Sequence, residues 1–191
     1  MISALIALFL IACGSRGAPQ SPHRAIEHPR TWIEVNTEFA TIEIPSGWDI
    51  NVLDQPHVSA DNGFFLIPER GAIVAIYGLA TEYLDEVTAT PYIESFSERL
   101  QPDTLEARTK IIDFLDGRAH CASAQGMNGD YLTAACLFWP KKRQEFIPLA
   151  YIPRLRQDRF QAIGGFEMLS RIVRSSRGFR AGLSTTLRKA P

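Results

Sequence analysis

His120 and Cys121 are adjacent in the sequence, and an imidazole beside a thiol is the arrangement that activates a cysteine nucleophile. The surrounding residues predict a β-strand, however, and neighbouring residues of a strand point to opposite faces of the sheet. We therefore expect His120 to lie opposite Asp113 across a tight hairpin at Asp116-Gly117, as an ordinary cross-strand hydrogen-bonded pair. A catalytic role for His120 is the less favoured interpretation.

Cys121 and Cys136 are equidistant from Asn128-Gly129, a dipeptide that favours the centre of a hairpin turn. The two cysteines therefore face each other on adjacent strands. A two-residue turn makes them a hydrogen-bonded pair with Cα atoms ~5.5 Å apart, and a four-residue loop from Met127 to Asp130 makes them a non-hydrogen-bonded pair. Both separations suit a disulfide, which we predict in an oxidising compartment, with two packed free thiols as the alternative.

Two groups of residues could ligate metal weakly. His23 and His28 lie near the N-terminus without a third strong ligand on a rigid element. The acids Glu82, Asp85 and Glu86 lack the alternating ligands and turn glycine of a calcium loop. We expect a solvated acidic face there, and neither a metal nor another cofactor.

Cys13 follows an apolar segment, Ile2 to Ala12, that is too short to span a ~30 Å hydrocarbon layer and is typical of a removable export signal. The junction Leu10-Ile11-Ala12-Cys13 resembles the lipobox of bacterial lipoproteins. This resemblance implies cleavage before Cys13, a diacylglycerol thioether on its sulfur, and a cell-envelope location. Gly14 after the cysteine resembles lipoproteins that are sent to an outer membrane. An ordinary secretory signal or a buried apolar strand is the alternative.

The sequence predicts four segments: a signal at 1–12, a lipidated disordered tether at 13–30 containing Pro19, Pro22 and Pro29, a single α+β domain at 31–177, and a basic disordered tail at 178–191. The formal net charge of −1 gives no reason to expect nucleic acid as a partner. Six basic residues and no acid occur in 171–191, which could approach an anionic membrane, although a solvated end is favoured.

Alternating hydrophobicity predicts strands at 32–35 and 39–44, with Ala40, Ile42 and Ile44 on the buried face. A type I turn at Ile44-Pro45-Ser46-Gly47 should follow. Further strands are expected at 64–67 and at 73–79, and the second is apolar on both faces, which favours a central position.

A helix is expected to begin at Thr90 as N-cap with Pro91 at the first helical position, and to bury the stripe of Ile93, Phe96 and Leu100. From Lys110 the hairpin dipeptides predict a β-meander that ends with a strand over 145–152. A second helix is expected over 166–174.

The run from Phe39 to Trp48 (FATIEIPSGW), the central meander, and a closing helix ending Arg171-Ile-Val-Arg-Ser-Ser-Arg177 together resemble the PsbP-type fold. This resemblance covers residues 32–177 and implies an antiparallel sheet sandwiched between helices. The same fold occurs in photosystem extrinsic proteins and in many envelope lipoproteins of unassigned role, and we infer no photosynthetic role from it.

No nucleophile elbow, Ser-x-x-Lys pair, His-Glu-x-x-His helix or phosphate-binding glycine loop occurs in the chain. We therefore expect a membrane-tethered, non-enzymatic module that binds or scaffolds another envelope protein or component. The alternatives are a small-ligand carrier with a pocket between sheet and helix, and an enzyme whose site assembles from Asp113, His120 and the acids at 82–86. Trp139, at the end of a predicted strand beside a basic turn, is a possible contact point for a partner.

Overall fold

A computed structural model of the 191-residue chain describes residues 31–37, 40–52, 63–69, 72–80, 84–142, 144 and 146–179. The predicted signal, the tether with Cys13, His23 and His28, the acid Glu82, and the tail from residue 180 lie outside the described residues. The assignments made for them from the sequence stay predictions.

Among the described residues, the main sheet is entirely antiparallel and has seven strands. Its order is β3 (Asp49–Val52), β4 (Gly63–Glu69), β5 (Ala72–Ala80), β9 (Phe146–Arg156), β8 (Tyr131–Pro140), β7 (Gly117–Gly126) and β6 (Thr104–Phe114). The last four strands in sequence, β6 to β9, form the predicted meander. A separate hairpin contains β1 (Trp32–Asn36) and β2 (Thr41–Pro45).

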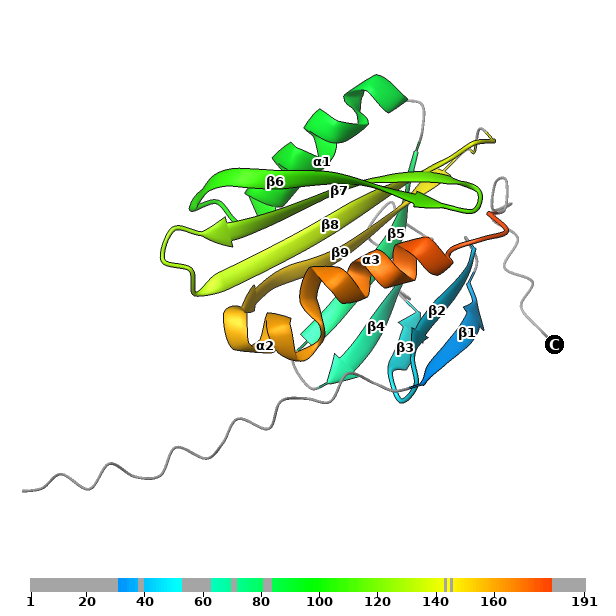
Figure 1. The fold of residues 1–191 in the computed structure, drawn as a ribbon, viewed down its shortest axis with the longest axis horizontal. Coiled ribbons are helices and arrows are strands. Elements are labelled where there is room, and N and C mark those ends of the chain that lie inside the picture. Colours follow the sequence, from blue (N-terminus) through cyan, green and yellow to red (C-terminus); the bar gives the residue numbers. More distant parts are fainter. Residues whose placement is uncertain are drawn as a thin grey trace, which may run out of the picture.

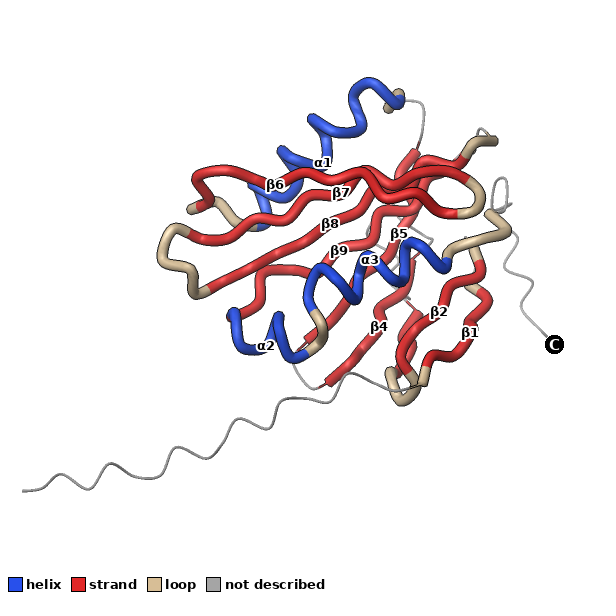
Figure 2. Tube along the Cα trace, viewed as in Figure 1, coloured by secondary structure: helices blue, strands red, loops and turns tan. Residues whose placement is uncertain are grey.

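Helices cover both faces of the sheet (Figures 1 and 2). The helix α1 (Glu86–Leu100) packs on β6, β7 and β8 from one side. The helices α2 (Gln157–Ala162) and α3 (Gly165–Ser175) lie on the other side together with the β1–β2 hairpin. This arrangement confirms the predicted α+β class, an antiparallel sheet between helical layers.

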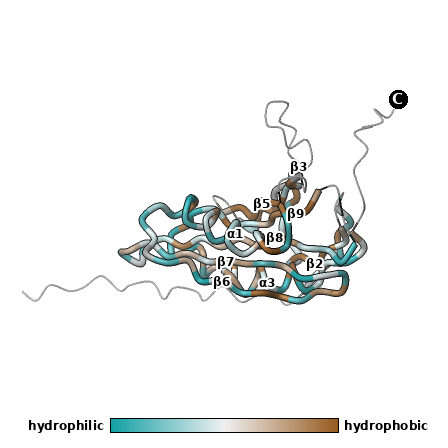
Figure 3. The backbone as a smooth tube through the Cα atoms, turned by 90° about the horizontal axis from the view of Figure 1, so that it is seen from above, coloured by the Kyte–Doolittle hydropathy of each residue, from teal (hydrophilic) through white to brown (hydrophobic). Residues whose placement is uncertain are grey.

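The alternation of side chains along the central strands divides the core into two clusters, one on each face. Figure 3 shows α1 and α3 on opposite sides of the strands. On the α1 side, Ile93 packs over Leu137 and Leu149, all of them fully buried. On the α3 side the buried side chains are those of Ile42, Ile44, Cys121, Cys136, Leu169, Ile172 and Val173, among others. The predicted buried face of the first hairpin, with Ala40, Ile42 and Ile44, is therefore confirmed.

The prediction that α1 begins at Thr90 is wrong, because an earlier residue caps the helix. The Asp85 carboxylate accepts a hydrogen bond from the backbone N–H of Thr88 at 2.8 Å, and the Thr88 hydroxyl contacts the backbone N–H of Asp85 at 3.2 Å. This reciprocal capping box starts the helix at Glu86 and leaves Pro91 inside it.

The predicted position of the β6–β7 turn is also wrong, by one residue. Phe114 pairs with Gly117, so Leu115 and Asp116 form the turn, and Gly117 is already a strand residue. The shift places His120 opposite Ile111 instead of Asp113. The strand position of Gly117 requires glycine, because a Cβ atom there would lie 2.2 Å from the carbonyl oxygen of Trp139.

The turn after β2 involves residues 45–48 rather than the predicted 44–47, since the N–H of Trp48 bonds to the carbonyl of Pro45 at 3.4 Å. Gly47 has a φ of +86° and so takes the third position of the turn, where a type II turn requires positive φ. The predicted type I turn is therefore replaced by one that depends on Gly47.

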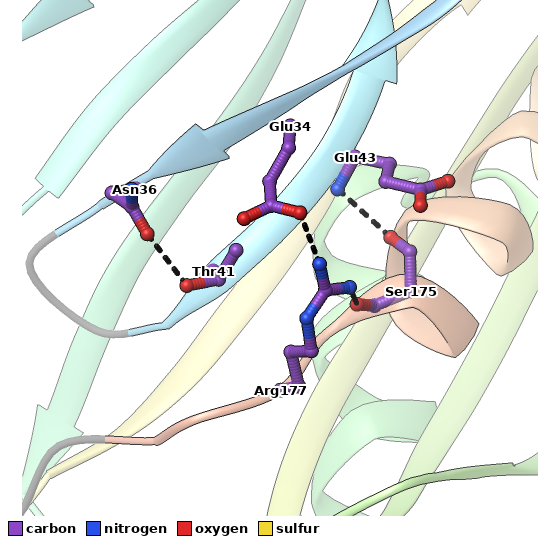
Figure 4. A network of polar contacts seen from close by, with 6 residues as sticks. All are labelled: Glu34, Asn36, Thr41, Glu43, Ser175 and Arg177. Carbon is purple, nitrogen blue, oxygen red and sulfur yellow. Dashed lines mark hydrogen bonds and ion pairs between the residues drawn. The ribbon is translucent and has the colours of Figure 1, made fainter.

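The C-terminal end of α3 holds the first hairpin on the sheet (Figure 4). Thr41 and Arg177 exchange two backbone hydrogen bonds of 2.9 and 3.0 Å, and the Ser175 hydroxyl accepts the N–H of Glu43 at 2.9 Å. The Arg177 guanidinium also forms an ion pair with the Glu34 carboxylate. The closing sequence that carried the family resemblance therefore has a structural role, which is to fasten the hairpin to the helix.

Candidate functional site

Cys121 and Cys136 lie opposite each other on β7 and β8 with a Cα separation of 4.0 Å, and their sulfur atoms are bonded. The loop between the strands has four residues, Met127 to Asp130, which is the geometry that makes the cysteines a non-hydrogen-bonded pair. Both side chains are buried beneath the α3 layer. The bond therefore acts as a cross-link inside the core.

His120 points away from these cysteines, into the interface between the sheet and α1. Its Nδ1 lies 2.7 Å from the Thr90 hydroxyl, its side chain is 5% exposed, and its Nε2 has no hydrogen-bond partner among the described residues. Asp113 lies on the exposed edge strand, opposite Arg118. In the structure, His120 therefore pairs with neither Cys121 nor Asp113, as a Cys-His nucleophile or a His-Asp pair would require.

Burial lowers the pKa of His120 below its ordinary value of 6.5; the Glu86 carboxylate opposes this shift and the Arg118 guanidinium adds to it. Because the folded protein resists protonation of His120 while the unfolded chain accepts the proton near pH 6.5, stability should fall as the pH drops below that value. We expect His120→Asn, which keeps a polar group near Thr90, to lose less stability between about pH 7 and pH 5. Urea unfolding of both proteins at the two pH values measures the difference, and equal losses would contradict the prediction.

Two of the three acids near the start of α1, Asp85 and Glu86, are described, and each of them has another partner. Asp85 caps the helix, and its hydrogen bonds with Thr88 lower the pKa of its carboxyl. Glu86 forms a 3.4 Å ion pair with Arg118. Within the described residues, no group of three or more His, Cys, Asp or Glu side chains is placed to hold a metal.

The strongest surface feature lies at one end of the sheet, where the N-terminus of α1, the β6–β7 turn and the end of β8 meet. We call it the sheet-end surface, and it consists of Glu86, Val87, Leu115, Arg118, Trp139 and Lys141. Val87 is 86% exposed and Leu115 is 70% exposed, which are the two highest values among the large apolar residues that the structure describes. In Figure 1 this is the right-hand end of the sheet, where both turns lie.

Two depressions of about 280 and 390 Å³ adjoin each other on the sheet-end surface, and both are lined by Glu86, Trp139, Pro140 and Lys141. Trp139 is half-buried and packs against the α1-side cluster, so its side chain is held in place beneath the two depressions. The backbone N–H of Lys141 bonds to the carbonyl of Asp116 at 2.7 Å, which joins the two turns. The two depressions therefore combine Trp139 and Pro140 with the charged residues Glu86 and Lys141.

The sequence indicated Trp139 as a contact point but did not reveal Val87 or Leu115. Val87 was missed because the helix was expected to begin later, and Leu115 because it was assigned to a strand instead of the turn. The spacing of Asp85 and Thr88 is that of a capping box, and this signal could have placed Val87 on the first turn of the helix.

Other depressions lie on the outer surface too. One of about 440 Å³ is lined by Arg108, Ser123 and Gln125, among others, and one of about 640 Å³ by Tyr131, Arg156 and Asp158, among others. In contrast, the layers between the sheet and the helices are filled mainly by buried apolar side chains. Within the described part of the chain, no helix has the length and apolar character needed to cross a membrane.

No protein-family model matches the sequence, and no curated protein matches it either. Among solved structures, the chain is similar to the solution structure of cyanobacterial PsbP (CyanoP) from Synechocystis sp. PCC 6803, with a TM-score of 0.51 and 12% sequence identity over 88% of this chain and 98% of that chain. At this level of identity the likeness establishes the fold alone. The chain therefore has a PsbP-like fold, as its sequence indicated.

Proposed function

We propose that this protein is a lipid-anchored module of the cell envelope that binds another envelope protein through the sheet-end surface and performs no catalysis itself. The observation that supports binding most strongly is the high exposure of Val87 and Leu115 at the end of the sheet where Trp139, Glu86 and Lys141 line two depressions. Large exposed apolar side chains and a nearby tryptophan are features of protein contact sites.

Both alternatives receive less support from the geometry. A ligand carrier needs an apolar cavity between sheet and helix, and Ile93, Leu137 and Leu149 fill that layer on the α1 side. An enzyme built from scattered residues needs His120 paired with Asp113. In the structure His120 is buried against Thr90 and lies opposite Ile111, whereas Asp113 is exposed and lies opposite Arg118.

The anchor in this proposal is Cys13, and it rests on the lipobox-like sequence before it. One thioether-linked diacylglycerol supplies two acyl chains, and two chains hold a protein on a bilayer far more firmly than one. Gly14 favours the outer membrane as the destination, where the organism has one.

The test uses the full chain with a C-terminal affinity tag, produced in its own envelope and cross-linked before extraction. Cys13→Ser should move the protein from the membrane fraction to the soluble fraction. Leu115→Ser should lose a cross-linked partner that the parent protein retains, because the substitution removes an exposed apolar side chain from the sheet-end surface.

Met127→Ser is the matched control, since Met127 is also exposed, at 66%, and lies in the turn at the other end of β7. A partner lost with Leu115→Ser and kept with Met127→Ser supports the proposal. Equal capture by both variants overturns the binding part, and a Cys13→Ser protein that still fractionates with membranes overturns the anchor.

A further inference from the structure

The strand β6 forms one edge of the main sheet, and its outer side pairs with no strand among the described residues. It has eleven residues, whereas the opposite edge strand, β3, has four. Long uncovered edges are unusual because their free N–H and C=O groups can pair with another chain. The regular part of β6 runs from Ala107 to Phe114, after an irregularity in the pairing with β7.

The direction of the free backbone groups follows from the hairpin. Phe114 and Gly117 flank a two-residue turn and therefore form a hydrogen-bonded pair, and such pairs alternate along the ladder. Lys110 and Cys121 are then also a hydrogen-bonded pair, which agrees with the 4.0 Å approach of Cys121 to Cys136 on the other side. By the same alternation Ala107 points outward, but it lies next to the irregularity at the start of the strand. In the central part of β6 the residues whose N–H and C=O point outward are Thr109, Ile111 and Asp113.

These groups can all be satisfied by a second copy of the same strand. We propose that the protein forms a symmetric dimer in which the β6 strands of two copies pair in antiparallel fashion about Ile111. In this register Ile111 faces Ile111 of the second copy, and Thr109 faces its Asp113. Every outward-pointing residue from 109 to 113 then opposes another outward-pointing residue.

The charges on β6 favour this register over its neighbours. A dimer centred on Lys110 sets two lysines against each other, and one centred on Thr109 sets Arg108 against Lys110; like charges directly opposite each other destabilise strand pairing. A dimer centred on Ile112 leaves Thr109 beyond the paired region. Only the register centred on Ile111 uses all three outward residues and opposes no like charges within the strand.

The side chain at the centre also suits an interface between copies. Ile111 is 54% exposed on the α1 side of the sheet, although α1 also contacts β6. Its neighbours on the same face, Thr109 and Asp113, are exposed and short. Pairing would cover Ile111 against its own copy, which is the partner that a two-fold axis supplies.

Cysteine cross-linking of the full chain in its membrane tests both the dimer and its register. Ile111→Cys should give a disulfide-linked dimer on oxidation, since opposed hydrogen-bonded residues have Cα atoms ~5.5 Å apart. Thr109→Cys is the matched control: it should not cross-link, because the two copies of residue 109 would be four residues out of register. The parent protein reports any cross-link through Cys13.

Sedimentation of the full chain extracted in detergent gives an independent reading. Ile111→Lys should raise the dissociation constant about tenfold or more, because it places two lysines on the axis, and should leave the thermal midpoint almost unchanged at this exposed site. Dimer cross-linking by Ile111→Cys but not Thr109→Cys, with loss of the dimer in Ile111→Lys, supports the proposal. Equal cross-linking of both cysteine variants, or a parent protein that sediments as a monomer at every concentration, overturns it.

Discussion

Replacing both Cys121 and Cys136 by alanine is expected to lower the free energy of unfolding by about 3 kcal/mol, the value that a chain-entropy treatment gives for a loop of this size. The cross-link closes a segment with a sequence separation of 15, and opening it enlarges the set of unfolded conformations. Equilibrium unfolding in urea at constant pH, for the double variant and the parent protein, measures the loss.

Two controls separate the bond from the packing of the sulfur atoms. Reduction of the parent protein should give most of the same loss, since the sulfur atoms then remain in the core between the strands and α3. Intact mass before and after reduction should differ by the two hydrogens of one disulfide. Two free thiols in the native protein, or a double variant as stable as the parent, would falsify the cross-link as a source of stability.

Gly117→Ala is expected to destabilise the protein by about 1–3 kcal/mol or more, as overpacking in a well-packed region does. The new Cβ atom would lie 2.2 Å from the carbonyl oxygen of Trp139 and 2.8 Å from the Cα of Pro140. These are backbone atoms, so β7 and β8 must move apart where the sheet-end surface is built. Urea unfolding gives the loss of stability, and tryptophan fluorescence reports the disturbance at Trp139.

Gly126→Ala, at the other end of β7, is the matched control. Its Cβ would lie 2.6 Å from the Nε2 of Gln101, which is the end of a side chain and can move more easily than backbone. We expect a smaller loss and no change near Trp139. If Gly126→Ala proved more damaging than Gly117→Ala, the close approach of the two strands could not be the reason for glycine at 117.

Local sequence determined those features in which neighbouring residues already contain the necessary information. The alternation of Ala40, Ile42 and Ile44 predicted the buried face of the first hairpin, because strand side chains alternate whatever the strand packs against. Asn128-Gly129 predicted the centre of the β7–β8 hairpin, and that centre alone placed Cys121 opposite Cys136. The helical stripe from Phe166 onward predicted α3, whose buried face includes Leu169, Ile172 and Val173.

Local signals failed where two of them competed for the same position. Thr90-Pro91 has the composition of a helix start, but the capping box of Asp85 and Thr88 begins the helix earlier. Pro91 therefore lies inside the helix, where it has no backbone N–H to donate. Asp116-Gly117 has the composition of a turn centre, but the close approach of Trp139 requires the glycine inside the strand instead. The one-residue shift then gave His120 a different neighbour, since register sets every cross-strand pair.

Tertiary structure alone decided which surfaces are available to partners. Glu86, Arg118 and Trp139 come from three different elements, and they line one depression at the end of the sheet because α1 packs there. The exposure of β6 likewise depends on strand order, which brings β9 between β5 and β8 and leaves β6 at the edge. Periodicity in the sequence describes how each segment divides its own side chains between two faces. Which segments become neighbours in space depends on packing over the whole domain. The sequence therefore predicted the elements and their buried sides, whereas the assembled fold determined the binding surfaces.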